Sequence, residues 1–399
     1  MRRAALTGRE SVIFVILAIF SVLAKLYFSS FGANYDTDSN LLISNLIREG
    51  KIVYAETTRY NYGPIWAYLV GLFRTIQVDV FDGHSITGFH YVAAFFLSFV
   101  DIALSLLLVF YFSFTFGLIF LLNPVSMLIT GFHSQFDNLA VLVGFAGSVL
   151  IFKYEERQQK KNLYFILGLI VLGFSLMLKH ILVFFPIWFL FRNKYSPAKR
   201  LALLTVPVVV FLLGFVPFIF DPVNRAGVMH NVFGYSSVHL TGFYPNFVGA
   251  FIPIKMIEKV FSFVPIFSGF KFVWFLSTVW AGYTFRHKPV IELFFYYLIA
   301  FCAFSSASAD QYLAIPLIAC AVLWKNPIVW FYTIMSLMAI VGSQVNIGVV
   351  VPFLRPINLT LQELGMTNGY PLAFLFVLLI FLAVKEIRKK SVAEKVSTA

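Results

Sequence analysis

Apolar runs long enough to cross a lipid bilayer follow one another along most of this 399-residue chain. A helix needs about 20 such residues to cross the hydrocarbon core, and only helices and closed barrels satisfy their backbone polar groups there. We expect about twelve spans, at roughly 11–31, 86–112, 115–131, 137–152, 162–179, 181–192, 201–220, 269–285, 289–305, 309–324, 326–343 and 369–386. The sequence therefore predicts an all-α polytopic membrane protein, with residues 1–399 forming one transmembrane domain.

The basic residues indicate how the chain is oriented. Lysine and arginine gather in alternate segments between the runs, for example at 2–9, 153–161, 192–200 and 385–395. The positive-inside rule assigns such segments to the cytoplasm, so both termini are predicted to be cytoplasmic, with a bacterial inner membrane as the favoured location. Most acidic residues then fall on the outer side. Basic loops beside anionic lipid explain the net charge of +12, so no nucleic-acid partner is expected.

Two carboxylates, Asp36 and Asp38, stand just after the first run, in a predicted outer loop at 32–85. Carboxylates at the mouth of a membrane-embedded body need water, partners or a substrate to satisfy them. We therefore expect this pair to be the chemical centre. The alternative is an ordinary solvated loop with a helix N-cap, because Asp, Ser and Asn are preferred N-caps.

The outer loops also contain short apolar pieces. In the first loop, residues 41–47 have helical spacing, and Gly50 is a plausible stop for that helix. Residues 65–73 are apolar but too short to span, so they predict an interfacial helix lying on the membrane. A second long outer loop is expected at 221–268, which is rich in Gly, Pro, Phe and Tyr.

A polar turn at 131–138 separates two apolar runs and includes His133, Gln135 and Asp137. Polar side chains at membrane depth must be hydrogen-bonded to something. The functional interpretation is that His133 and Asp137 face the same cavity as Asp36 and handle phosphate, metal or sugar. The alternative is a capped helix start, with Ser134 or Asp137 as the N-cap.

Further candidates for binding a phosphate group stand at the outer ends of later runs. Lys179 and His180 suit a phosphate, although Lys179 could instead snorkel to the interface. The late candidates are Asp310, Gln311, Tyr312 and Arg355. For Arg355 the alternative is an exposed loop arginine that is only solvated. Asp101 lies within a run and is expected to serve helix packing through a hydrogen bond.

Several nucleotide-binding and catalytic signatures are missing from the sequence. It contains no P-loop, no GxGxxG fingerprint, no GxSxG elbow and no Cys/His zinc spacing. A soluble nucleotide cofactor is therefore not supported. An enzyme acting on the outer face would need an activated donor that is itself a membrane lipid.

Three short motifs carry a resemblance to a known superfamily. They are Tyr35-Asp36-Thr37-Asp38-Ser39-Asn40 with the later Thr58-Arg59-Tyr60-Asn61-Tyr62-Gly63-Pro64, then His133-Ser134-Gln135-Phe136-Asp137-Asn138, and Asp310-Gln311-Tyr312-Leu313. Their order resembles the GT-C superfamily of membrane glycosyltransferases, particularly the mannosyltransferase of GPI-anchor assembly and related bacterial and archaeal enzymes. The second is similar to the H-x-Q-[FY]-[DN] turn of that superfamily.

The resemblance implies a donor sugar, with mannose favoured, linked to a polyprenyl phosphate. The hexose would pass with inversion to a glycan or glycolipid acceptor on the outer face, with membrane lipid as a further partner. Asp36 is the first choice for general base and Asp38 the second. Donor phosphate or sugar binding falls to His133, Gln135, Asp137, Lys179, His180, Asp310, Gln311, Tyr312 and Arg355, and acceptor binding to Arg59, Tyr60 and Tyr62. No cofactor is required, although Asp36 and Asp38 would be compatible with a divalent cation.

Two other functions compete with that of a glycosyltransferase. A transporter or lipid-linked-saccharide flippase would distribute ionisable groups through the bilayer, whereas this chain places only Asp101 and Glu292 there as acids. A polysaccharide polymerase or ligase would be expected to depend on arginines in its outer loops, and few are present. The sequence therefore favours an outer-face glycosyltransferase.

Overall fold

The computed structural model describes residues 6–31, 34–157, 162–235, 270–305, 309–343, 355–364 and 368–398. Within these ranges the regular structure is helical and no strand occurs. The chain divides into two compact units. Unit 1 comprises Met1–Val183 and Thr205–Ser236, and unit 2 comprises Phe184–Leu204 and Ser237–Ala399.

Four of the described helices are long and apolar enough to cross a membrane. They are α1 (Gly8–Ser29), α5 (Ile86–Tyr111), α8 (Asp137–Glu156) and the Gly369–Lys389 part of α21 (Gly369–Thr398). Two bent pairs raise the number to six if each is one span: α6 (Phe114–Leu121) with α7 (Pro124–Gly131), and α9 (Asn162–Leu178) with His180–Phe191. The prediction of a helical membrane protein is thus confirmed in its general form.

The expected span at 115–131 is bent by 48° where α6 meets α7. The bend falls at Asn123-Pro124, where the Asn123 side chain accepts from the Val125 N–H and Pro124 starts α7. Proline has no N–H and cannot continue a preceding helix, but it suits the first turn of a new one. The predicted run is therefore two short helices rather than one straight helix.

The remaining helices of unit 1 lie mostly in the first predicted outer loop. In that loop they are α2 (Tyr35–Arg48), α3 (Val53–Glu56), α4 (Pro64–Thr75) and the π-helix η1 (Ile76–Val80). Later in the chain, unit 1 also contains the part of α11 (Pro197–Leu213) from Thr205 onward, α12 (Val216–Ile219), α13 (Pro222–Val228) and the π-helix η4 (Met229–Phe233). Of the second predicted loop, 221–268, residues 236–268 are outside the described residues.

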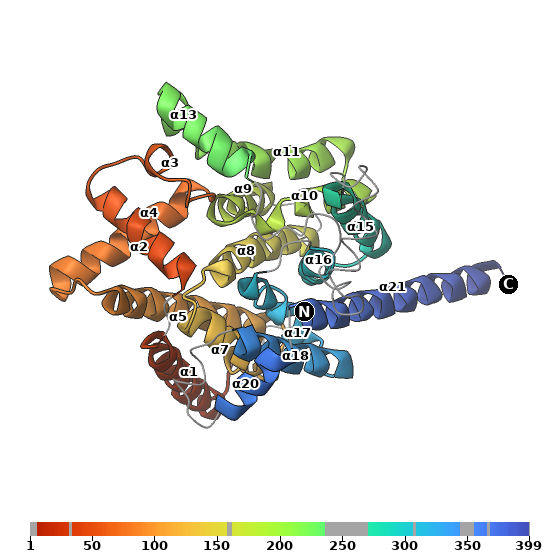
Figure 1. The fold of residues 1–399 in the computed structure, drawn as a ribbon. Helices are drawn as coiled ribbons and strands as arrows, with labels where there is room; N and C mark the ends of the chain where they lie inside the picture. The colour runs from red at the N-terminus through yellow and green to blue at the C-terminus, as the bar shows by residue number, and fades with distance from the viewer. Residues whose placement is uncertain are drawn as a thin grey trace, which may run out of the picture. The chain divides into compact units, whose positions relative to one another are not determined.

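The helix predicted over 41–47 is α2, and the one predicted over 65–73 is α4. Helix α2 starts earlier than expected, at Tyr35, and ends at Arg48, with Gly50 just beyond it at φ +70°. The two helices lie side by side (Figure 1). Their facing sides form a core with Ile43, Leu46, Trp66, Val70 and Phe73. The first loop is thus a folded substructure on α5.

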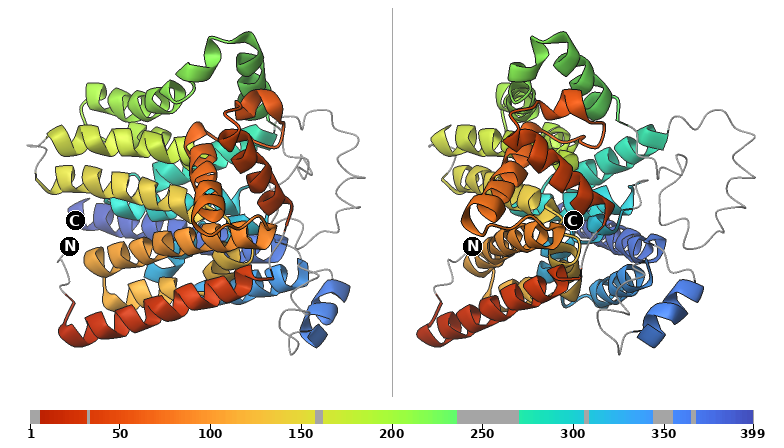
Figure 2. Two further views of the ribbon diagram at one scale, coloured as in Figure 1. Left: turned by 90° about the vertical axis from the view of Figure 1, so that its left-hand side faces the viewer. Right: turned by 60° about the vertical axis from the view of Figure 1, so that its left-hand side comes forward.

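Helix α1 buries one face that carries three polar and two apolar side chains, and it exposes apolar side chains on the opposite face. Phe14, Ala18, Ser21, Lys25 and Ser29 are buried, and their spacing makes one helical face. The apolar side chains of the opposite face are exposed: Val12, Val15, Ile16, Ile19, Phe20 and Leu23. An exposed apolar face suits a helix surrounded by lipid. The buried face packs against α5, α6 and α7 (Figure 2).

The contact between α1 and α7 requires a glycine at position 131. A Cβ added to Gly131 would lie 2.7 Å from the Lys25 carbonyl oxygen and 2.9 Å from the Lys25 Cα. We expect Gly131→Ala to cost about 1–3 kcal/mol of stability, because overpacking against backbone forces a shift. Thermal unfolding in detergent measures this, with Gly8→Ala as the control, since nothing lies within 4 Å of a Cβ there. Equal unfolding temperatures for the two variants would contradict the close contact.

Unit 2 contains α10 (Phe185–Trp188), the 3-10 helices η3 (Phe189–Phe191) and η7 (Asp310–Leu313), α15 (Phe270–Phe285), α16 (Val290–Ala303), α17 (Leu317–Val322), α18 (Pro327–Ser343), α20 (Arg355–Glu363) and α21. Helix α21 packs against α15, α16 and α18. The Trp188 indole ring packs on Gly282, because a Cβ added to Gly282 would lie 2.6 Å from that ring. Lys288 pairs with Glu386 at 2.9 Å, which ties the start of α16 to α21.

Candidate functional site

Asp36 and Asp38 lie in the first turn of α2 but point to different sides of it. Two residues along a helix correspond to a rotation of about 200°. The Asp36 side chain is half-buried and its Oδ2 accepts a hydrogen bond from Gln135 Nε2 at 2.6 Å, whereas Asp38 is exposed. The N-cap of α2 is Asn34, whose Oδ1 accepts from the Thr37 N–H at 2.9 Å. Of the two candidate bases, only Asp36 faces the rest of the site.

The turn at 131–138 joins α7 to α8 through a strained residue. Ser134 has φ +47°, a conformation that non-glycine residues adopt at a cost. The N-cap of α8 is Phe136, without a side-chain cap hydrogen bond, and Asp137 is the first residue of the helix. The alternative in which Ser134 or Asp137 caps α8 is therefore wrong. Asp137 still lies where the helix dipole favours a negative charge.

Alternate residues of this turn bind the start of α2. Asn34 Nδ2 lies 2.7 Å from His133 Nδ1, and Gln135 Nε2 donates to Asp36, each pair being 99 residues apart in the chain. His133 and Gln135 are two residues apart in the turn, and so are their partners Asn34 and Asp36 at the start of α2. The two hydrogen bonds thus fix the turn against the first turn of α2. The sequence predicted that His133 and Asp137 share a cavity with Asp36, whereas the direct partner of Asp36 is Gln135 and that of His133 is Asn34.

Asp137 belongs to a buried ion pair with Lys179. The Lys179 ammonium donates to Asp137 Oδ2 at 2.7 Å, and the lysine is only 5% exposed. The ammonium also lies 5.3 Å from the centre of the Tyr62 ring and 4.9 Å from that of Phe136, positions that favour a cation. Lys179 therefore does not snorkel to water, and its charge is shared with a carboxylate at the site.

The neighbouring His180 takes a different direction. Its ring packs on Phe211 of α11 with centroids 5.2 Å apart. The adjacent Lys179 and His180 are therefore divided between two environments, and only Lys179 reaches Asp137. A change of backbone direction between α9 and the 3-10 helix η2 (His180–Leu182) separates them.

Aromatic rings hold the Lys179–Asp137 pair in place. Phe136 stacks on Trp66 of α4, with centroids 3.9 Å apart and an interplanar angle of 11°, and Tyr62 meets Phe136 edge-on at 5.0 Å. Burial, together with the nearby Asp36 and Asp137 carboxylates, raises the pKa of the Tyr62 hydroxyl well above its ordinary value. Tyr62 therefore stays protonated and can donate a hydrogen bond.

The three residues predicted to bind an acceptor have different surroundings. The Arg59 guanidinium donates to the Tyr35 carbonyl at 3.0 Å and lies 4.0 Å from the centre of the Tyr35 ring, beside Asp36 in the chain. Tyr60 is fully buried; its hydroxyl donates to the Gly63 carbonyl and accepts from the Ala67 N–H. Arg59 and Tyr62 thus belong to the site, whereas Tyr60 holds the start of α4.

A second buried network lies beneath the turn and centres on Asp101. Lys25 Nζ is 2.6 Å from Asp101 Oδ2, and both side chains are at most 1% exposed. Thr130 Oγ1 donates to Oδ2 at 2.8 Å and Asn138 Nδ2 donates to Oδ1 at 2.6 Å. Asp101 thus makes the hydrogen bonds between helices that its place within a predicted span led us to expect. The pairing of Asp101 with Lys25 was not predicted from the sequence. The signal was that both charged residues lie within predicted spans, where a charge needs a partner.

The late candidates belong to unit 2. Asp310 accepts from Ser343 Oγ at 3.0 Å and from Asn368 Nδ2 at 2.8 Å. Gln311 and Tyr312 follow in η7, and Arg355 is exposed at the start of α20. Asp310 thus ties η7 to α18 and to the residue preceding α21.

The described residues hold no group of three or more His, Cys, Asp and Glu side chains that could bind a metal ion. Because the side chains of Asp36 and Asp38 point to different sides of α2, they are poorly placed to bind one cation together. Comparison of the chain with protein-family models, curated proteins and solved structures finds no match. The site is consequently defined by its own geometry: a half-buried carboxylate, a buried ion pair and phenol and amide groups between them.

Proposed function

We propose that the protein is a GT-C-like glycosyltransferase that moves a hexose, with mannose favoured, from a polyprenyl phosphate to a glycan or glycolipid on the non-cytoplasmic face. The observation that carries this proposal is Asp36: a half-buried carboxylate oriented by Gln135 and next to a buried Lys179–Asp137 pair. A hydroxyl nucleophile needs such a proton acceptor nearby.

The proposed reaction is a single displacement. The acceptor hydroxyl oxygen attacks the anomeric carbon of the donor as the bond from that carbon to the phosphate oxygen breaks, which inverts the configuration. The hydroxyl proton passes to Asp36, and the lipid phosphate leaves with the bonding electrons. Gln135 engages Oδ2 of Asp36, so Oδ1 is the oxygen that takes the proton.

The leaving phosphate and the sugar would use the other side chains of the site. Departing negative charge is stabilised by fixed cations and hydrogen-bond donors, which here are Lys179, Arg59 and the protonated Tyr62. The buried Oδ1 of Asp137 has no hydrogen-bond partner among the described residues. A sugar hydroxyl would satisfy it, because a buried carboxylate oxygen without a donor is costly. His133 completes this side of the site.

The finer membrane arrangement belongs to the same proposal. It has about twelve membrane helices, cytoplasmic termini and an outward-facing site, in a bacterial inner membrane, as the distribution of lysine and arginine predicts. The loop helices α2 and α4 would then lie at the outer surface, where a lipid-linked donor and a glycan acceptor can meet.

The test is sugar transfer by purified protein in nanodiscs. Radiolabelled polyprenyl-phosphate mannose, glucose and other hexoses are supplied with a membrane-lipid extract, with Mg²⁺, Mn²⁺ or EDTA, and Asp36→Asn serves as the inactive control. We expect label to move from one lipid-linked donor to a new product of inverted configuration, and not from nucleotide sugars. If none of the lipid-linked donors is turned over, the proposal is wrong.

A transporter or lipid-linked-saccharide flippase is the second candidate. The observation that favours it is the Lys25–Asp101 pair, since ionisable groups within membrane helices often mark transport pathways. Reconstituted liposomes carrying a fluorescent lipid-linked saccharide decide between the two: movement between leaflets without any glycosidic product would favour the flippase.

A further inference from the structure

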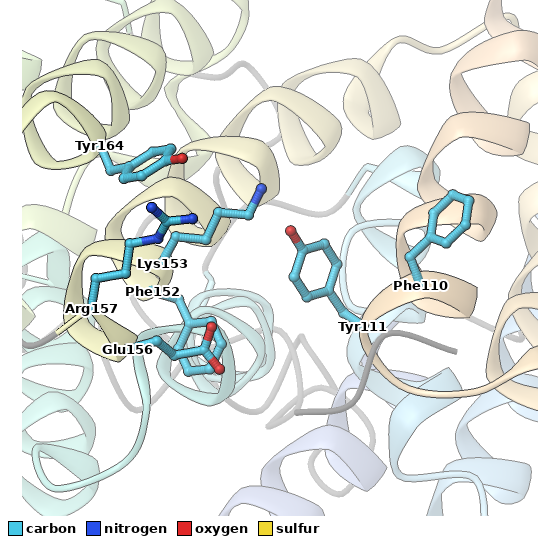
Figure 3. A pocket seen from close by; sticks show the side chains of 7 residues that line it. All are labelled: Phe110, Tyr111, Phe152, Lys153, Glu156, Arg157 and Tyr164. Atoms are coloured by element: carbon cyan, nitrogen blue, oxygen red, sulfur yellow. The ribbon is translucent and has the colours of Figure 1, made fainter. Parts of the chain in front are cut away.

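A pocket of about 120 Å³ lies at the end of unit 1 away from Asp36, among α5, α8 and α9 (Figure 3). It is lined by side chains at the end of α5, at the end of α8 and near the start of α9: Phe110, Tyr111, Phe152, Lys153, Glu156, Arg157 and Tyr164. Helix α8 runs from Asp137 to Glu156, so the pocket is about 30 Å from the catalytic turn. This distance is about the thickness of a bilayer core, and the pocket cannot serve the same reaction.

Cations and phenols converge on this pocket. Lys153 and Arg157 are four residues apart and share one face of α8, and Arg157 lies 4.9 Å from the centre of the Tyr164 ring. Figure 3 shows the Lys153 ammonium and the Tyr111 hydroxyl pointing toward one another across the opening. The exposed Glu156 also lines the pocket, so that the side chains around it carry a net charge of +1. Among the described residues, neither cation makes an ion pair with a carboxylate.

The rim of the pocket is apolar and exposed. Phe110, which lines the pocket, is 44% exposed, and α9 carries further exposed apolar side chains on the face turned away from Tyr164, Leu163 at 65% and Ile166 at 51%. Apolar side chains exposed on membrane helices face acyl chains. Basic residues in the last turn of α8 would complement its dipole in any case, but the dipole does not account for a hollow that joins two cations, two phenols and an apolar rim.

We propose that this pocket binds the headgroup of an anionic phospholipid, with the phosphodiester at Lys153, Arg157 and Tyr111 and the acyl chains along Phe110 and α9. The segment 153–161 is predicted to be cytoplasmic from its four basic residues, and the cytoplasmic leaflet carries the anionic lipid that basic pockets between membrane helices bind. The site is independent of the proposed sugar transfer.

Native mass spectrometry of the purified protein titrated with phosphatidylglycerol tests the proposal. Wild type should retain one anionic lipid more tightly than phosphatidylethanolamine. The double variant Lys153→Ala, Arg157→Ala should bind it about 30-fold more weakly, which is about 2 kcal/mol at 1.4 kcal/mol per factor of ten. The control variant Arg9→Ala, Lys389→Ala removes two exposed cations that do not line the pocket, and it should bind as wild type does.

Inorganic phosphate and glycerol phosphate separate a lipid from a soluble ligand. We expect neither to displace the lipid at millimolar concentration, because both lack the chains that contact the rim. Displacement by inorganic phosphate would overturn the lipid assignment, as would equal affinity for phosphatidylethanolamine. Equal binding by wild type and the Lys153, Arg157 variant would overturn the pocket itself as the site.

Discussion

Replacing Asp36 by asparagine will lower the rate of sugar transfer by about 10²- to 10⁴-fold, the range that general-base catalysis contributes. Asparagine keeps the size of the side chain and can still bond Gln135 after an amide flip, but it cannot take the proton of the acceptor hydroxyl. The kcat should fall while the KM for the donor changes little. Initial rates of label transfer in nanodiscs measure both quantities.

Asp38→Asn is the matched control for this experiment. It removes the same charge from the same helical turn, but from the exposed side of α2, so transfer should stay within about threefold of wild type, as for a surface substitution away from the chemistry. The assignment of the base is wrong if Asp38→Asn is the inactive variant. Equal loss in both variants would instead indicate that the two carboxylates act together, for instance on a cation.

Lys25→Met will destabilise the protein by about 3–5 kcal/mol, because it leaves the Asp101 carboxylate buried without its cation. Methionine fills a similar volume, so the loss reports the charge rather than a cavity. Both partners are at most 1% exposed, so the lone carboxylate would be buried away from bulk water. Chemical unfolding in detergent micelles, followed by helix content, measures the change.

Two further variants distinguish this explanation from a general sensitivity of the fold. Lys25→Met combined with Asp101→Asn should recover most of the stability, because no lone charge is then buried. Arg48→Met breaks an exposed ion pair with Asp79, at 2.9 Å, and should cost at most about 1 kcal/mol. A double variant no more stable than Lys25→Met would contradict the ion-pair account.

The sequence predicted the local pieces of the site well. Helical spacing and a glycine stop located α2, the short apolar run located α4, and the order of polar residues indicated that Asp36 meets the 131–138 turn. These predictions rest on periodicity and on the rule that buried polar groups need partners. Both can be read from a single stretch of residues.

The sequence could not give the rotation of a helix or the pairing of distant spans. Asp36 and Asp38 have different surroundings because α2 begins at Tyr35 and both lie in its first turn. Lys25 and Asp101 pair because α1 packs on α5 and α7, which no local pattern reveals. Tyr60 looked like a binding residue beside Tyr62, yet the Gly63-Pro64 turn directs it into the core.

The Lys25–Asp101 pair also bears on how the chain enters the membrane during translation. Lys25 leaves the ribosome 76 residues before Asp101, which at 5–20 residues per second is a delay of roughly 4–15 s. During that interval α1 carries a lysine that has no partner on α5. A lysine costs about 2.5–3.5 kcal/mol at the centre of a span, and less toward its end. Lys25 lies four residues from the end of α1, so its ammonium can reach the headgroups until α5 emerges. We expect the arrival of α5 to bury this lysine against Asp101, as in the folded protein.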